Sequence, residues 1–403
     1  MKIFHFNQKG QVLILSIFFM LVISVSIVMV FNAGQLATEK TRLVNAADAA
    51  VYSGSVFLAR NLNFMAYTNR AMIANHVVVG HLVSYMSWLR YVKNSSNKIS
   101  RVGRYIPYVN QVLEVVNRSV NGNLYVAEKV APRLITTIYR LNKSLHRAQK
   151  NIIWSMNGVL SVGGPTSVKI MSKIAKKYDA SIRINNMNDL NSMRSGNASI
   201  LAARQVYSDT KNIFSFMKKY TAHNDRGELQ RMVDISMGES RQWIRGNRGW
   251  EKRIFVINLK KEGYTNSSSN NSITDWSAHD EFTLSRFTWR GWRGTNLGKG
   301  SATATEFDRN YKGIEGYYGL RDPARKDMQS LKVSVYATLP MAIMADWGSH
   351  KKNGSRRLSA LSRAEIYYKR PVKEFNSKSV GEYSNLYNPF WQARLTKNRI
   401  ENE

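Results

Sequence analysis

The feature that most constrains this chain is an uninterrupted apolar run near its start. Residues 12–31 read VLILSIFFMLVISVSIVMVF and contain no charged side chain. A helix of this length spans about 30 Å, the thickness of the hydrocarbon core of a bilayer. Its serines are tolerated there because a helical serine can donate to a backbone carbonyl one turn earlier or to a neighbouring helix. The run therefore predicts a transmembrane helix over residues 12–31.

A cleaved signal peptide is the competing interpretation of this segment. The apolar region of a signal peptide is normally about 7–15 residues long, with small residues at a cleavage site close behind. Here the run is longer, and the small-x-small triplet at residues 47–49 lies too far downstream. We therefore favour an uncleaved, single-pass anchor. Lys2 and Lys9 favour a cytoplasmic N-terminus over residues 1–11, although basic residues just beyond the anchor weaken that asymmetry.

The chain of 403 residues is strongly basic, with 59 Lys and Arg against 27 Asp and Glu, a formal net charge of +32. This surplus makes polyanions, namely nucleic acid, anionic lipid or anionic glycan, the first class of partner to test. A biased composition rich in Lys, Asn, Ser and Ile is the alternative explanation. The absence of cysteine excludes a disulfide framework, a thiol nucleophile, an iron–sulfur cluster and cysteine-based zinc sites.

Helical periodicity continues beyond the apolar run. Between residues 35 and 91, nine positions with alternating spacings of four and three predict a seam on one helix face. They are Leu58, Leu62, Met65, Asn69, Met72, His76, Val79, Val83 and Met86. Asn69 and His76 interrupt the seam, either to fix register or a partner or as ordinary hydrogen-bonded core residues. Residues 94–97, NSSN, predict a loop, and a second helix over 108–149 contains Pro132, which predicts a kink or break.

The rest of the chain divides into a helical middle and a β-rich end. Shorter helices are expected at residues 166–178, 198–221 and 227–245, with a connecting stretch at 180–197. Strands rich in β-branched and aromatic residues are expected at 253–264, 281–289, 331–339 and 364–370, with long loops at 265–279 and 294–328. No β-α-β alternation occurs, so the sheet is expected to be small and antiparallel.

Together these elements predict an α+β chain in which a transmembrane helix extends into a helical stalk. The expected regions are a cytoplasmic N-terminus at 1–11, the anchor at 12–31, the stalk at 32–165, a helical middle region at 166–250 and a β-rich C-terminal periplasmic region at 251–403. We see no internal repeat.

No motif for chemistry stands out. His76 and His81 are five residues apart, which does not place both rings on one helix face, and the acidic cluster at 279–281 lacks a partner. Residues 234–238, DISMG, depart from the D-x-S-x-S adhesion loop of von Willebrand A domains. No phosphate loop, zinc-protease motif or nucleophile elbow occurs. We predict a non-enzymatic protein with no metal, no cofactor and no small-molecule substrate.

The best candidate for polyanion contact is the segment at residues 286–293, RFTWRGWR. Guanidinium groups pair with phosphates, and aromatic rings stack on bases. Packing of cations on aromatic rings across a sheet surface is the alternative, which we favour. The candidate contact residues are Arg286, Trp289, Arg290, Trp292 and Arg293. Side-chain alternation along this strand also predicts a bulge or strand end near Ser285.

Both ends of the chain carry a family resemblance. Gly10-Gln11 opens the apolar run, and the segment Asn45, Ala46, Ala47, Asp48, Ala49 and Ala50 follows it. This pattern resembles the N-terminal module of TadE/TadG-like proteins, a family of Flp (tight-adherence) pilus assembly. Residues 66–71, AYTNRA, and 385–395, NLYNPFWQARL, resemble a subgroup with a basic periplasmic region. The resemblance implies a protein of the bacterial inner membrane whose bulk is periplasmic or at the cell surface.

The small-residue segment at 45–50 is also physically interpretable. Its alanines give a low-profile helix surface on which neighbouring helices can pack closely. Asp48 is expected either to pair with a basic residue of a neighbouring subunit or to be solvated. Gly10 is a candidate processing position, but the fifth residue after it is Leu15, where prepilins have Glu.

These observations predict a minor pilin-like or accessory component of Flp pilus assembly with a structural role. Its expected partners are the inner membrane and other pilus-machine subunits or pilin-like helices. The alternative is a membrane-tethered protein that binds a polyanion such as DNA or an envelope glycan.

Overall fold

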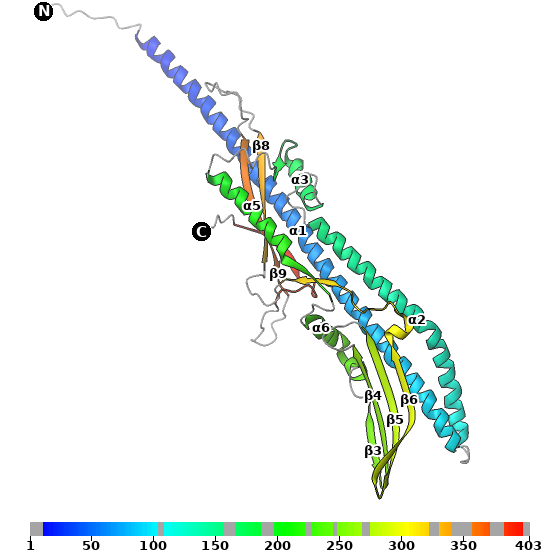
Figure 1. Ribbon diagram of the computed structural model, residues 1–403. Coiled ribbons are helices and arrows are strands. Elements are labelled where there is room, and N and C mark those ends of the chain that lie inside the picture. Colours follow the sequence, from blue (N-terminus) through cyan, green and yellow to red (C-terminus); the bar gives the residue numbers. More distant parts are fainter. Residues whose placement is uncertain are drawn as a thin grey trace, which may run out of the picture.

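The computed structural model describes residues 11–103, 109–156, 166–186, 197–221, 227–244, 248–267, 275–321, 330–340, 357–370 and 383–397. Its spine is α1 (Gln11–Gly103), a single helix of 93 residues. At 1.5 Å per residue, α1 measures about 140 Å. Figure 1 shows α1 running the length of an elongated molecule, with its first turns projecting beyond the other helices and strands. The expected anchor and stalk are therefore one continuous helix.

The loop predicted at residues 94–97 is wrong, because α1 continues through it. The side chain of Asn94 donates to the carbonyl of Lys299 at 2.7 Å, and Ser96 donates to the side chain of Asn117. Asn and Ser favour turns when they bond to their own backbone. Here they bond to distant segments instead, and these contacts keep the residues helical.

The second helix, α2 (Val109–Met156), packs alongside the far part of α1 (Figure 1). It contains Pro132 and is not broken there. All nine seam positions of α1 are buried, which confirms the seam predicted from their spacing. The seam is buried because apolar residues three and four positions apart form one stripe along a helix.

The part of the molecule nearest the anchor, which we call the proximal half, packs around residues 43–65 of α1. It contains α3 (Thr166–Tyr178), α5 (Asn197–Phe216) and an antiparallel sheet in the order β1-β8-β9-β10. The strands are β1 (Arg183–Ile184), β8 (Ser330–Pro340), β9 (Arg357–Tyr368) and β10 (Trp391–Thr396). One sheet face packs on α1, and α5 covers part of the other, where Val206 meets Tyr336.

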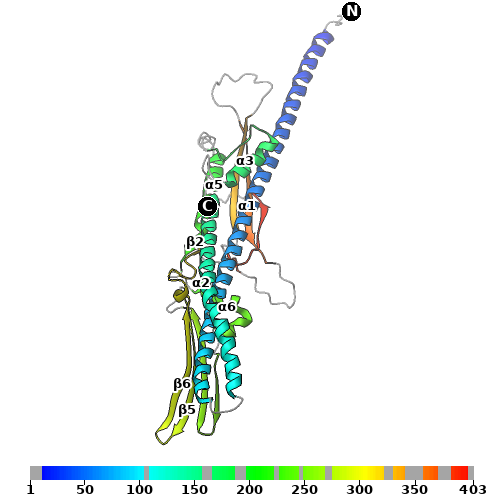
Figure 2. The same ribbon diagram turned by 90° about the vertical axis from the view of Figure 1, so that its right-hand side faces the viewer.

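The distal half packs around residues 72–89 of α1. Its main sheet is an antiparallel meander of β3 (Trp250–Ile254), β4 (Ile257–Ser267), β5 (Trp276–Thr288) and β6 (Gly291–Thr303). The short helical pieces beside it are α6 (Glu228–Met237), η1 (Gly238–Ser240), α7 (Arg241–Ile244) and α8 (Ala304–Phe307). Figures 1 and 2 show the two hairpins extending to the end of the molecule opposite the N-terminus.

The β structure is more extensive than predicted. Between the halves, β2 (Met217–Tyr220) pairs with β7 (Tyr317–Leu320), so the helix predicted at 198–221 ends five residues early, at Phe216. Strands occupy both ends of the loop predicted at 265–279, and β6, α8 and β7 occupy much of the loop predicted at 294–328. The remaining parts, 268–274 and 322–328, lie outside the described residues. The β5–β6 register shifts between Phe282 and Thr283, three residues before the expected irregularity at Ser285. The bulge places an extra residue on β6 rather than ending β5.

Candidate membrane anchor and assembly module

The first part of α1 is not covered by any of the residues that the structure describes. Its most apolar window has a mean hydropathy of 3.0, and none of that window is buried within the protein. Ser16, Ser24 and Ser26 each donate to a backbone carbonyl of the preceding turn at 2.8 Å, as predicted. An apolar helix with internally satisfied backbone and hydroxyl groups suits a hydrocarbon solvent. This segment is long and apolar enough to cross a membrane once.

Two cations mark the point where α1 enters the folded part of the molecule. Lys40 donates to the carbonyl of Ser359 on β9, and Arg42 donates to the carbonyl of Tyr178. Arg42 also lies 3.8 Å from a carboxylate oxygen of Asp179. Hydrogen bonds from Ser181, with a smaller contribution from Arg42, lower the pKa of Asp179. Basic side chains thus hold the base of the proximal half beside the apolar segment.

The small-residue segment at 45–50 follows directly. Ala46, Ala47 and Ala50 are fully buried against α3 and the proximal sheet of the same chain. Asp48 is half-buried and accepts a hydrogen bond from Ser362 on β9, whereas Asn45 is exposed. The low profile of the alanines therefore allows α1 to approach its own sheet closely. Gly10, the candidate processing position, lies outside the described residues.

The polar seam residues lie inside the protein. The side-chain amide of Asn69 donates to the carbonyls of Tyr318 and Leu386, both at 2.8 Å, and its oxygen accepts from Gln149 of α2 at 2.7 Å. Asn69 therefore joins α1 to β7, α2 and the C-terminal segment. Asn69 lies in residues 66–71 and Leu386 in 385–395, so two segments whose resemblance to a subgroup is a prediction from the sequence meet here.

His76 occupies the equivalent place in the distal half. Its Nδ1 is 2.8 Å from the hydroxyl of Tyr311, and its backbone carbonyl accepts from the indole of Trp276 at 2.8 Å. Its ring lies 5.0 Å from the ring of Trp276. Both seam residues therefore set the register of α1 against elements of the same chain, and their role toward other chains stays a prediction.

The sequence-predicted polyanion contacts lie on the β5–β6 hairpin at the far end of the molecule. Trp289 is 86% exposed and Arg290 lies over its ring at 4.3 Å. Arg253 of β3 lies over the ring of Trp292 at 5.0 Å. Cross-strand packing of cations on aromatic rings is thus present. The two remaining candidates, Arg286 and Arg293, face each other in the β5–β6 register.

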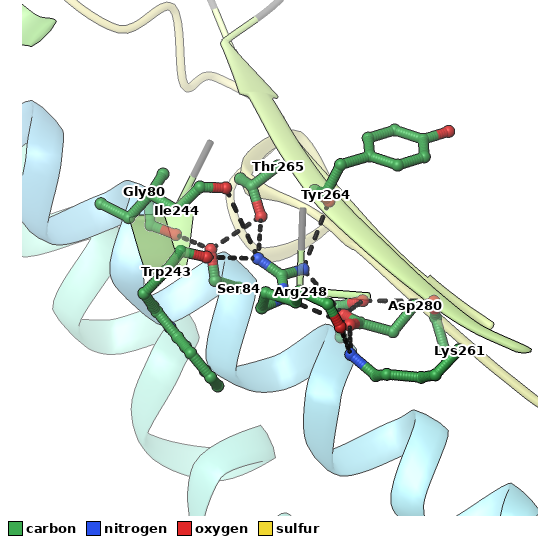
Figure 3. A network of polar contacts seen from close by, with 11 residues as sticks. Gly80, Ser84, Trp243, Ile244, Arg248, Lys261, Tyr264, Thr265 and Asp280 are labelled. Atoms are coloured by element: carbon green, nitrogen blue, oxygen red, sulfur yellow. Dashed lines mark hydrogen bonds and ion pairs between the residues drawn. The ribbon is translucent and has the colours of Figure 1, made fainter. Parts of the chain in front are cut away.

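A buried ionic cluster in the distal half was missed by the sequence analysis (Figure 3). The fully buried carboxylate of Asp280 pairs with Arg248 at 2.8 Å and Lys261 at 3.0 Å, and accepts from Ser87 of α1 at 2.7 Å. Arg248 also donates to the hydroxyl of Thr265 at 2.8 Å. These residues come from four separate stretches of the chain, so no local pattern could reveal them. Because both cations engage the carboxylate, the cluster is structural in character.

Chemistry-bearing groups are sparse elsewhere. Within the described ranges, no group of three or more His, Cys, Asp or Glu side chains could hold a metal. An open hollow of about 280 Å³ between α2 and residues 308–315 is lined by charged side chains. Its Glu315 accepts from Tyr139 and pairs with Lys143 at 3.3 Å. Although burial opposes it, these partners lower the pKa of Glu315, which keeps the carboxylate ionised rather than poised as an acid.

Comparison with known protein families finds a match for one part of the chain. Residues 10–61 match the family described as "Putative Flp pilus-assembly TadE/G-like". The match covers the apolar segment and residues 45–50, and it confirms the resemblance predicted from them. No curated protein and no solved structure matches the chain. The N-terminal part of α1 is therefore a TadE/G-like module, and it supports a role in Flp pilus assembly.

Proposed function

We propose that this protein is a non-catalytic, inner-membrane component of Flp pilus assembly, anchored by residues 12–31. The observation that carries the proposal is the continuity of α1, in which an apolar segment without protein cover becomes the core helix of a large folded region. Because α1 is one continuous helix, the position of the anchor in the membrane determines the position of the folded region. Such a component acts by binding other subunits of the machine.

An accessory role is better supported than a place in a filament shaft. Ala46, Ala47 and Ala50, the face on which partner helices were expected to pack, are covered by the chain's own sheet and α3. The segment of α1 before Leu43, its first fully buried residue, is therefore the main surface for lateral contact with pilin-like helices. We assign helix–helix contact in the membrane to residues 12–31.

The assembly role is tested by deleting the gene and scoring surface pili and adherence. Loss of both, restored by the full chain, is the expected result. Complementation with Leu21→Arg, a charge at the centre of the anchor, should be weaker because a charged residue there costs about 2.5–3.5 kcal/mol of insertion free energy. Tyr207→Arg, an exposed change on α5, is the matched control and should complement. Normal pili and adherence in the deletion strain would contradict the role.

Orientation is tested with single cysteines, since the chain has none of its own. Lys9→Cys and Tyr207→Cys lie on opposite sides of the anchor. A membrane-impermeant maleimide should label residue 207 in spheroplasts and residue 9 only after lysis. The reverse pattern would overturn the proposed cytoplasmic N-terminus while leaving the anchor itself intact.

A further inference from the structure

The two hairpins of the distal sheet end in loops of the same design. Ile254 pairs with Ile257 and Thr288 pairs with Gly291, so each loop has two residues and begins with an aromatic side chain. The first loop is Phe255-Val256 and the second is Trp289-Arg290. The amide of Phe287 donates to the carbonyl of Val256 at 2.7 Å, which holds the loops side by side. We call the two loops and their flanking residues 250–257 and 286–293 the distal tip.

Apolar exposure at the distal tip is extreme. Phe255 is 96% exposed and Trp289 is 86% exposed. Ile254, Val256 and Phe287 are each about half exposed. Phe255 also has a φ of 49°, a left-handed conformation that an aromatic residue rarely adopts. The loop thus holds a bulky ring in a disfavoured conformation where it packs on nothing in the described part of the protein, which points to an external contact.

The charges around the apolar loops have one dominant sign. Arg253, Arg286, Arg290 and Arg293 surround the exposed rings within the two strand pairs, and Glu251 is the acid described beside them, 3.9 Å from Arg253. Apolar side chains at the end and arginines one or two residues behind them are the arrangement used at bilayer interfaces. There the rings enter the headgroup–acyl boundary, and the guanidinium groups meet lipid phosphates.

We propose that the distal tip inserts into the surface of a bilayer containing anionic phospholipid, separate from the membrane that holds the anchor. Geometry requires a separate membrane because α1 rises roughly 110 Å between Phe31 and Gly103, and the tip lies at that far end (Figures 1 and 2). The protein would then span the gap between two lipid surfaces. This step rests on the proposed anchoring of residues 12–31.

Lipid fits the tip better than nucleic acid does. Bases stack on aromatic faces, but the exposed Ile254 and Val256 are aliphatic and provide no stacking surface. One face of Trp289 already carries the guanidinium of Arg290. Hydrocarbon, in contrast, accepts aliphatic and aromatic side chains alike. DNA binding is therefore an outcome that would contradict the proposal.

The decisive measurement places a polarity-sensitive fluorophore on the tip of the full chain. Val256→Cys, 56% exposed, keeps both aromatic rings, and Tyr207→Cys on α5, 62% exposed, is the matched control. Each labelled protein is reconstituted through its anchor into phosphatidylcholine nanodiscs. Vesicles of phosphatidylcholine alone, or with phosphatidylglycerol, are then added. We expect a blue shift and brighter emission at residue 256 only, and only with phosphatidylglycerol.

Three results would overturn the proposal: no response at residue 256, an equal response at residue 207, or a response to duplex DNA in place of vesicles. Equal responses to neutral and anionic vesicles would overturn the assignment to anionic lipid. Failure of the anchor is seen separately, as protein that does not enter nanodiscs. The nanodisc-free protein that stays in the supernatant after centrifugation is then added to vesicles directly, so the tip is still tested.

Substitutions separate the apolar and electrostatic contributions. Phe255→Ser with Trp289→Ser should weaken co-flotation with phosphatidylglycerol vesicles about ten- to hundred-fold, while Tyr125→Ser with Tyr207→Ser should not. Arg286→Gln with Arg293→Gln should weaken co-flotation with these vesicles about five-fold for each charge removed at low salt. Arg204→Gln with Lys211→Gln on α5 is the matched control and should not weaken it. Unchanged melting temperatures verify that every variant is folded. Equal effects of tip and control pairs would contradict the proposed site.

Discussion

The proximal and distal halves bring α1 against a sheet with different side chains. In the proximal half, the fully buried core between α1 and its sheet consists of alanines and larger apolar residues, with Ala46, Ala47 and Ala50 among them, and polar contacts such as Asn63 with Trp391 are only part-buried. In the distal half, the corresponding face carries polar residues, with Ser84 bonded to Thr265 at 2.8 Å and Ser87 bonded to Asp280. Both halves require close approach. The proximal half achieves it with small apolar residues and the distal half with hydroxyls and glycines.

Buried charge follows the same division. The proximal half has a buried ion pair, Asp209 with Arg363 at 2.9 Å, but it joins α5 to the sheet and not to α1. The distal cluster lies directly against α1 and holds two cations on one carboxylate. Apolar packing degrades gradually when it is perturbed, whereas a buried charge that loses its partner is strongly destabilising. The distal half should therefore be the more fragile one.

The largest expected effect is that of Asp280→Asn. The variant leaves Arg248 and Lys261 buried without a countercharge, at a cost of about 3–5 kcal/mol of unfolding free energy. Hydrogen exchange on the full chain should show lost protection in β4, β5 and β6, while β8 and β9 keep theirs. Glu306→Gln removes the more exposed Arg90–Glu306 pair, 2.7 Å apart, and should cost at most about 1 kcal/mol.

Asp209→Asn makes the same change in the proximal half. It leaves a single buried cation, Arg363, and should cost less than Asp280→Asn, with exchange rising in α5 while α1 stays protected. If either variant lost hydrogen-exchange protection equally in both halves, the proposed difference between the proximal and distal halves would be wrong.

The next effect belongs to the apolar contact of the proximal half. Ala47→Leu adds three carbons where α1 meets its sheet, and overpacking of this kind costs about 2–3 kcal/mol. Ala37→Leu, six residues before Leu43 on an exposed part of the same helix, is the control and should leave the melting temperature unchanged. Thermal unfolding in mild detergent measures both. A neutral Ala47→Leu would mean that the close approach is not required.

Glycines provide the corresponding test in the distal half. A Cβ added at Gly300 of β6 would overlap the backbone carbonyl of Ser87, so Gly300→Ala should cost about 1–2 kcal/mol. Gly122 is an exposed glycine within α2 with nothing near its Cβ position. Gly122→Ala should therefore stabilise the protein by about 0.5–1 kcal/mol. The two Gly→Ala substitutions should therefore change the free energy of unfolding in opposite directions. A stabilising Gly300→Ala would contradict the close approach of β6 to α1.

Much of the fold was predictable because its signals are local and periodic. The apolar run and the seam from Leu58 to Met86 specify α1 directly. The missed strand, β6, reads GWRGTNLGKGSAT, and such a run of glycines signals turns in isolation. Two of its glycines, Gly298 and Gly300, instead make room for α1. Residues 94–97 were misassigned for a related reason, because Asn94 bonds to Lys299 of β6 and Ser96 bonds to Asn117 of α2, both outside the local sequence.

The candidate site, too, was only partly predictable from the sequence. That Asn45–Ala50 would pack closely followed from its alanines, but the sequence could not say whether the partner was another helix or the chain's own sheet. The basic-aromatic segment at 286–293 was visible as composition. Its placement beside Phe255 depends on the pairing of β4 with β5, which no short-range pattern reveals. Contacts between distant segments account for what was missed.

The smallest expected effect is a pH dependence from two histidines outside the proximal half, His81 on α1 and His146 on α2. Burial, with help from Lys219 and Lys150 and against Gln149 and Glu315, lowers the pKa of His146, and burial lowers that of His81. Between these lowered values and the ordinary value of 6.5, the unfolded chain binds more protons than the folded one. The free energy of unfolding is then highest above pH 6.5 and falls as the pH drops below it.

Melting temperatures at pH 7.5 and 5.5 measure this loss of stability. The double variant His81→Gln, His146→Gln should show a smaller difference between the two pH values than the parent chain. Glu281, Glu315 and Glu365 also have lowered pKa values, so they titrate below this interval and do not contribute to it. Because both histidines are only half-buried, the change should be modest. An unchanged difference in the double variant would assign the pH dependence to other groups, and a larger one would reverse the sign argued here.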